Sequence, residues 1–256
     1  MDANSLEPGH WIRRYHPAPD SGARLLCLPH AGGSAGFFLP VARALSSVAD
    51  VLAVQYPGRQ DRRTEPCASS VTELADRLLP VLLDGWTDRP LALFGHSMGA
   101  SVAFELAGLL ERAGTPPAVL IASGRRAPSR LSPEYVHTLG DEALVAELKQ
   151  LSGTDARILG DDEMLRMVLP ALRADYRAAE TYQPERFHRV SCPVVTLTGD
   201  ADPKVPLDDA EAWREHTNGT FEMHVFPGGH FYLADRAPDV ITRIRTILAR
   251  TALPTG

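Results

Sequence analysis

The residues with the clearest chemical potential surround one serine. Ser97 is the centre of the pentapeptide GHSMG at 95–99. The apolar run LALFGH precedes it, and the helix-like pattern SMGASVAFELAGLLERAG follows from it. A sharp turn from strand to helix holds a serine in a strained conformation with its hydroxyl exposed, and small residues on either side leave room for the bend. The motif and its context predict that Ser97 is a nucleophile; a tight turn with an incidental serine is the alternative.

A serine hydroxyl is a weak nucleophile, so it needs a base, and the base needs an orienting carboxylate. His230 lies in the glycine-rich loop FPGGHFY after an apolar run and is the predicted base. Asp200 and Asp202 compete for the carboxylate, because both lie in LTGDADP beyond another apolar run. We favour Asp202, which lies beyond the turn, where a side chain can reach back toward a loop histidine. Asp200 is closer to the strand and is expected to bond loop backbone.

Acyl transfer forms an oxyanion, which two preorganised N–H donors must stabilise. The backbone of Met98, the residue after the predicted nucleophile, is expected to be one donor. Ala31 is expected to be the other, in the loop PHAGG at 29–33 after the first strong apolar run. A glycine turn without a ligand is the alternative for this loop. It matches neither GxGxxG nor GxxxxGK(S/T), so we reject nucleotide binding.

Short apolar runs alternate with longer amphipathic stretches, the pattern of a mostly parallel sheet flanked by helices. Nucleophile, acid and histidine follow one another in the order of the α/β-hydrolase fold. In open α/β sheets the active site lies at the carboxyl ends of the strands, where these three residues would meet. We expect strands at 24–29, 51–57, 91–96, 118–123, 193–200 and 221–226, and helices at 38–46, 71–86, 97–114, 208–217 and 239–250.

This alternation breaks between about Arg125 and Arg189. The stretch contains the helical patterns DEALVAELKQL and EMLRMVLPALRADYRAAETY but no convincing strand. We interpret residues 125–189 as a helical insertion that forms a lid over a pocket, because function concentrates in excursions from a scaffold. Structural filler is the alternative. The predicted organisation is one α/β-hydrolase domain over residues 1–256 with this lid insertion.

Length and composition fit one globular domain without a nucleic-acid partner. The chain has 256 residues, 44% hydrophobic and 23% charged, which is a globular rather than a disordered balance. Its net charge is −6 and its basic residues are dispersed, which argues against nucleic acid. Neither a signal-peptide core nor a membrane-length apolar run is present, so no membrane is expected. Cys27, Cys67 and Cys192 have no metal or redox spacing and predict free thiols in a reducing cytoplasm. A monomer is expected.

Seven motifs together resemble one family. From about Leu25 to Leu248 the chain is similar to the stand-alone type II thioesterases that accompany polyketide synthases and nonribosomal peptide synthetases. The PGR and SGRRAP segments are not demanded by hydrolase chemistry, so they distinguish this family from esterases at large. The motifs are LPHAGGSA at 28–35, QYPGRQDR at 55–62, GHSMGA at 95–100, SGRRAP at 123–128, DYRAAETY at 175–182, GDADPKV at 199–205 and FPGGHFYL at 226–233.

The resemblance implies a function that the triad alone does not. Such enzymes hydrolyse acyl groups from the phosphopantetheine thiol of acyl carrier or peptidyl carrier proteins, which releases stalled or wrongly primed units. Carried over to this sequence, Ser97, Asp202 and His230 become the triad, with Met98 and Ala31 as oxyanion donors. The lid would shape the acyl pocket. The resemblance implies neither a metal nor an organic cofactor.

Carrier proteins of these pathways tend to be acidic, whereas this chain is itself net negative. Docking would then need a local positive patch. Six arginines after two of the predicted strands are the candidates for it: Arg59, Arg62, Arg63, Arg125, Arg126 and Arg130. Solvated loop arginines and ion pairs that stabilise the fold are the alternative for each one.

Three rival functions stay open at this point. A hydrolase of free esters or acyl-CoA would use the same triad. A macrocyclising terminal thioesterase domain is disfavoured, because the chain starts at its own Met1 without an upstream linker. An inactive hydrolase fold that serves as a binding partner is disfavoured by the intact set of serine, aspartate and histidine.

Overall fold

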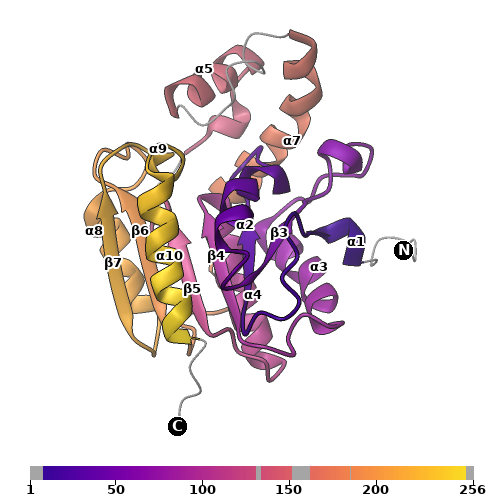
Figure 1. Ribbon diagram of the computed structural model, residues 1–256. Coiled ribbons are helices and arrows are strands. Elements are labelled where there is room, and N and C mark those ends of the chain that lie inside the picture. Colours follow the sequence, from indigo (N-terminus) through magenta and orange to yellow (C-terminus); the bar gives the residue numbers. More distant parts are fainter. Residues whose placement is uncertain (1–7, 131–133, 152–161, 185, 252–256) are drawn as a thin grey trace.

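The computed structural model describes residues 8–130, 134–151, 162–184 and 186–251. At its centre is a seven-stranded sheet in the order β1-β3-β2-β4-β5-β6-β7 (Figure 1). Strand β1 is antiparallel to β3, and all other neighbouring pairs are parallel. The strands are β1 (Ile12–Arg13), β2 (Arg24–Leu28), β3 (Asp50–Val54), β4 (Leu91–His96), β5 (Val119–Ser123), β6 (Val194–Gly199) and β7 (Phe221–Phe226).

Helices cover both faces of the sheet (Figure 1). The helices α3 and α4 pack on one face, and α2 and α10 pack on the other. A sheet covered on both faces has strands that are mostly apolar and shielded from solvent, and every residue of β2 to β6 is buried. The helices are α1 (Pro8–Trp11), α2 (Leu39–Leu45), α3 (Val71–Leu83), α4 (Met98–Arg112), α5 (Asp141–Leu151), α7 (Asp162–Glu180), α8 (Leu207–Glu211), α9 (Tyr232–Asp235) and α10 (Ala237–Thr251).

The two-residue repeat of the strands divides the core into two apolar clusters. In β2, Leu26 and Leu28 join the cluster under α3 and α4, whereas Leu25 and Cys27 join the cluster under α2 and α10. Because the strands that carry loops toward the site are parallel, the loops after β2, β4, β6 and β7 all leave from the same edge of the sheet. This edge therefore brings together segments that are far apart in the sequence.

The segment between β5 and β6 is helical in its described part. Its helices α5 and α7 lie beyond the edge of the sheet from which these loops leave (Figure 1). They share a small apolar cluster of their own, formed by Val136, Leu144, Leu148, Leu172 and Tyr176. The prediction of helices without a strand here is confirmed for the described residues; 131–133, 152–161 and 185 of the predicted insertion lie outside them.

The predicted α/β-hydrolase fold is confirmed, and the six expected strands are all present within three residues of the expected ends. Several short elements differ from the expectation, among them α1 and α9, which were not expected. The strand β1 was not expected, because two residues are too short to produce a pattern. The helix expected at 208–217 divides into α8 and a 3-10 helix, Ala212–His216. All three cysteines are free, with Cys27 and Cys192 buried. In the described residues, no helix has both the length and the apolar character to cross a membrane.

Candidate active site

Ser97 forms the turn between β4 and α4 with φ of 54° and ψ of −119°. Residues other than glycine rarely adopt a positive φ, and such strain persists only where the surroundings impose it. The flanking glycines have no room for a side chain. A Cβ on Gly95 would lie 2.2 Å from the carbonyl oxygen of Gly99, and one on Gly99 would lie 2.1 Å from that of Leu28. The prediction that small residues permit this bend is confirmed.

The structure brings Ser97, His230 and Asp202 into one hydrogen-bonded chain. Nε2 of His230 lies 3.1 Å from Oγ of Ser97, and Nδ1 lies 2.8 Å from Oδ2 of Asp202. His230 is 5% exposed and the Asp202 side chain is fully buried. A buried carboxylate beside Nδ1 favours the tautomer with its proton there, which leaves Nε2 free to accept the serine proton.

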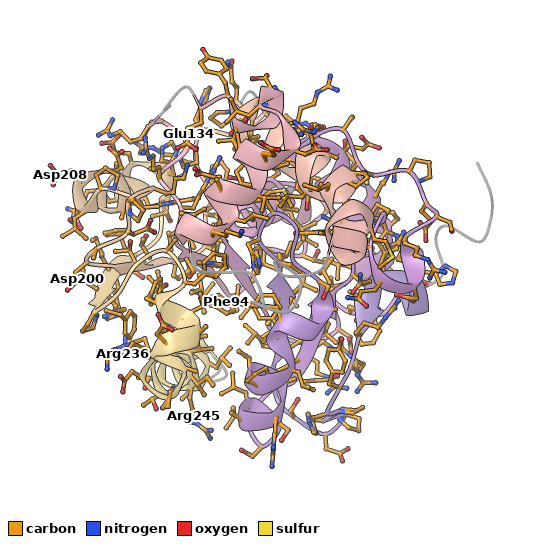
Figure 2. All side chains as sticks on the ribbon, turned by 90° about the horizontal axis from the view of Figure 1, so that it is seen from above. Phe94, Glu134, Asp200, Asp208, Arg236 and Arg245 are labelled. Atoms are coloured by element: carbon orange, nitrogen blue, oxygen red, sulfur yellow. The ribbon has the colours of Figure 1, made fainter. Side chains whose placement is uncertain are left out.

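The two aspartates of the loop after β6 have different partners. Besides His230, Asp202 accepts the backbone N–H of Lys204 on Oδ1 at 2.8 Å. Asp200 accepts the backbone N–H of Gly228 at 2.9 Å and lies exposed at the periphery of the molecule (Figure 2). The contact of Asp200 is therefore with loop backbone, as the sequence predicts, and only Asp202 reaches the histidine.

Met98, one predicted oxyanion donor, directly follows Ser97, and Ala31, the other, lines the same cavity as Ser97. Met98 is the first residue of α4, and the first N–H groups of a helix have no partner within it. Ala31 lies in the loop after β2 and lines the same cavity as Ser97 and His230. The N–H of Gly33 donates to the carbonyl of His30 at 2.9 Å, which closes a tight turn around Ala31.

A cavity of about 320 Å³ opens over Ser97 and His230. Its walls come from the loops of the sheet edge and from the helical segment between β5 and β6. Leu148 and Leu151 of α5 and Tyr176 of α7 supply apolar surface. Charged side chains line it as well: Arg125, Arg126, Arg130, Glu134, Glu180 and Lys204. Within the described ranges, no group of three or more His, Cys, Asp or Glu residues is placed to hold a metal ion.

Two further histidines, His96 and His30, lie near His230. The ring of His96 is 5.2 Å from that of His230 and 5.9 Å from that of His30. Burial lowers the pKa of His30 to about 3, with the positive charges of His230 and Arg59 acting in the same direction. Burial also lowers the pKa of His96 well below its usual value. Both stay neutral near pH 7, so a protonated His230 has no second cation among these neighbours.

His96 is held by a polar chain that the sequence did not reveal. Its Nδ1 lies 3.0 Å from Oγ of Ser123, which lies 2.6 Å from the hydroxyl of Tyr232. All three residues are fully buried. His96 belongs to the turn around Ser97, and nothing in the sequence pairs it with the last residue of β5 or with the first residue of α9. The chain fixes the residue before Ser97 and thereby supports the turn.

The predicted positive patch is wrong for two of its six arginines. Arg59 and Arg62 are buried and pair with Asp175 and Glu65. Arg125 is partly buried and donates to the carbonyl of Ala179 at 2.8 Å, which ties α7 to the loop after β5. Arg126 and Arg130 have acidic partners, Asp209 at 3.7 Å and Glu215 at 3.0 Å, and Arg63 is exposed. Arg59 and Arg62 are therefore parts of the fold, and the patch stays a prediction for the other four arginines.

Comparisons with known proteins show the family to which the chain belongs. A family model described as a thioesterase domain matches residues 23–248. The chain is 53% identical over 241 residues to thioesterase PikA5 of Streptomyces venezuelae, covering 94% of this chain and 86% of that protein. Among solved structures, type II thioesterase BorB from the borrelidin biosynthetic cluster superposes with a TM-score of 0.87 at 52% identity, covering 93% and 97% of the two chains.

A more distant structure shares the same frame. YbtT, a type II thioesterase from the yersiniabactin pathway, superposes with a TM-score of 0.82 at 32% identity, covering 95% of this chain and all of that one. The family model covers residues 23–248. Each of these relatives is more than 30% identical to this chain over more than 90% of its length. The chain therefore belongs to the thioesterase family of the α/β-hydrolase fold, and type II thioesterases are among its relatives.

Proposed function

We propose that this chain hydrolyses acyl thioesters carried on the phosphopantetheine arm of acyl carrier or peptidyl carrier proteins. The observation that supports this most strongly is the chain from Ser97 through His230 to Asp202, at 3.1 and 2.8 Å, on the floor of a cavity. Ser97 is the nucleophile, His230 the general base and Asp202 the orienting carboxylate. The carrier-bound substrate is supported by the relatives YbtT, a type II thioesterase from an NRPS/PKS biosynthetic pathway, and BorB, a type II thioesterase from the borrelidin biosynthetic cluster.

In the first half-reaction, Oγ of Ser97 attacks the thioester carbonyl carbon while its proton passes to Nε2 of His230. The new oxyanion accepts hydrogen bonds from the N–H groups of Met98 and Ala31. Asp202 stabilises the imidazolium that results. When the tetrahedral intermediate collapses, the C–S bond breaks, and the leaving thiolate takes the proton from His230. The products of this step are the free thiol and an acyl ester on Ser97.

In the second half-reaction, His230 takes a proton from water as the water oxygen attacks the acyl carbon. The same two N–H groups stabilise the second oxyanion. Collapse breaks the bond between the acyl carbon and Oγ of Ser97, and the proton on His230 returns to that oxygen. The enzyme regains its starting state and releases a carboxylic acid.

The helices between β5 and β6 act as a lid in this scheme. The residues that they contribute to the cavity wall, among them Leu148 and Tyr176, lie opposite the catalytic loops and would contact the acyl chain. Lys204, two residues after Asp202, pairs with Glu134 at 2.8 Å and with Glu147 of α5. These ion pairs tie the lid to the loop that carries the catalytic carboxylate.

The partner is tested by comparing one acyl group on three leaving groups. Acetyl or propionyl is loaded on a phosphopantetheinyl carrier protein, on coenzyme A and on p-nitrophenol, and kcat/KM is measured for each. We expect the carrier-bound thioester to have the highest kcat/KM, because only the carrier adds protein contacts outside the cavity. If the free esters are hydrolysed equally fast or faster, the assignment of the triad still holds, but the chain is a general serine esterase and not a carrier-specific enzyme.

A further inference from the structure

The ion pair between Arg59 and Asp175 takes no part in the proposed chemistry, yet it lies behind the loop that carries Ala31. Asp175 is on α7, and Arg59 follows β3, 116 positions earlier. Their side chains are 4% and 7% exposed. The Oδ2 atom of Asp175 accepts Nη2 of Arg59 and also accepts the backbone N–H of Gly32 at 2.8 Å. A buried charge is thus directed at the backbone next to a predicted oxyanion donor.

The segment around Arg59 holds the same loop at a second point. The side-chain oxygen of Gln55 accepts the backbone N–H of Ala35 at 3.1 Å, and its nitrogen donates to the carbonyl of Arg59 at 3.3 Å. Arg59 is fixed in turn by donation to the carbonyl of Pro57. The QYPGR motif therefore holds the loop after β2 directly at Ala35 and through Asp175 at Gly32.

Helix α7 also packs on this loop. Gly32 has φ of +74°, and a Cβ on it would lie 2.6 Å from Cδ1 of Leu172, one turn before Asp175. Ala31 packs against the apolar cluster that contains Leu172. Within the turn, the bond from the N–H of Gly33 to the carbonyl of His30 orients the peptide group between His30 and Ala31, which carries the N–H of Ala31. The bond to Asp175 orients the next peptide group, between Ala31 and Gly32.

We propose that Asp175, held by Arg59, is a positioning residue that keeps the N–H of Ala31 aimed at the oxyanion by anchoring Gly32. The inference rests on the proposed function, because it requires the oxyanion of acyl transfer. Preorganised donors stabilise a transition state only when they do not have to reorient during the reaction. The same arrangement makes the donor depend on α7, so the lid must be seated on the loop for the oxyanion site to be complete.

Arg59 has an electrostatic task in this arrangement. An unpaired carboxylate behind the loop would oppose the negative charge that develops on the substrate oxygen, and pairing with a guanidinium removes that opposition. Without the carboxylate, Arg59 has no charge to neutralise, so only the loss of the bond to Gly32 remains. The variant Arg59→Met combined with Asp175→Leu is therefore expected to lose about as much kcat as Asp175→Ala alone, rather than the product of two separate losses.

The test separates transition-state stabilisation from substrate binding. In Asp175→Ala, we expect kcat per active site to fall by about 10- to 100-fold, while KM changes less than about threefold. The expected decrease in kcat is smaller than the decrease caused by removal of a whole oxyanion donor, because the N–H of Ala31 is loosened and not removed. The affinity for a trifluoromethyl ketone, which forms a tetrahedral adduct with an oxyanion, should fall by a similar factor. Asp175→Asn, which retains an acceptor and the side-chain shape, should lie between this variant and wild type.

Asp50 supplies the matched control. It is also a buried carboxylate that accepts a backbone N–H, from Ala18 at 3.1 Å, and pairs with an arginine, Arg14 at 2.8 Å. It lies at the opposite end of β3 from the loop. Asp50→Ala should lower thermal stability and leave kcat per active site unchanged.

The positioning role would be overturned if both Asp175 variants lost thermal stability but retained the kcat and the ketone affinity of wild type. If Asp175→Ala does not fold, Asp175→Asn decides the question by the same two measurements. If the proposed function itself is wrong, wild type does not hydrolyse thioesters. That outcome is distinct from unchanged kcat in the Asp175 variants.

Discussion

Ser97→Ala is expected to lower kcat for thioester hydrolysis by about 10⁴-fold or more, because the acyl group then has no oxygen to which it can transfer. The substitution removes one oxygen at a turn whose backbone is held by the close contacts of Gly95 and Gly99. Alanine accepts the same φ of 54° at a similar cost, so the fold should persist. Steady-state kinetics with a thioester substrate, together with a thermal melt, measure both expectations.

Ser46 provides the matched serine for this experiment. It follows α2 just before β3, at the edge of the sheet opposite the active site. Ser46→Ala deletes the same atom and should retain wild-type kcat. If Ser97→Ala kept activity near wild type in a folded protein, the assignment of the nucleophile would be wrong.

Asp202→Asn is expected to lower kcat by roughly 10³- to 10⁴-fold, since the amide does not stabilise the imidazolium and favours the wrong tautomer of His230. The neighbour Asp200 gives a control two residues away. Asp200→Asn retains an oxygen that can accept the N–H of Gly228, and it should leave kcat within about threefold of wild type at a cost of at most about 1 kcal/mol of stability. The ratio of the two kcat values is the measured quantity.

In the structure, Asp202 contacts His230 and Asp200 contacts the backbone of Gly228, so the two variants should differ clearly in kcat. A larger loss in Asp200→Asn than in Asp202→Asn would contradict the contact of Asp202 with Nδ1 of His230 at 2.8 Å. Equal and small losses would show that the carboxylate contributes little and that His230 is oriented by other groups.

Much of the site could be predicted from sequence because each of its parts is a local motif. The strained turn at Ser97, the glycine loop before His230 and the aspartates after β6 each show their function within about seven residues. The rule that parallel strands end at one edge then assembles parts that are 133 and 28 positions apart. The same rule brings the loop of Ala31 to the edge at which Ser97 lies, and both residues line one cavity.

The features that could not be predicted depend on pairs whose two members carry no shared local signal. Arg59 was a candidate for the positive patch, with an ion pair that stabilises the fold as one alternative, and the structure shows such an ion pair. Its partner Asp175 lies on a helix of the insertion, and only the packing of that helix shows that both are buried. The PGR segment that contains Arg59 distinguished the family in the sequence, and Asp175 begins another of the seven motifs. Their contact in the structure provides a physical reason for the presence of both.

The central claim is that an acyl group passes through Ser97, and trapping that ester tests it most directly. Wild-type enzyme is mixed with an acyl-loaded carrier protein, quenched within milliseconds to seconds and examined by mass spectrometry of the intact protein and of its peptides. The account predicts a transient mass increase equal to the acyl group, located on the peptide that contains Ser97 and missing in Ser97→Ala. Release of the acid at the wild-type rate with no adduct on Ser97, and equally fast release by Ser97→Ala, would contradict it.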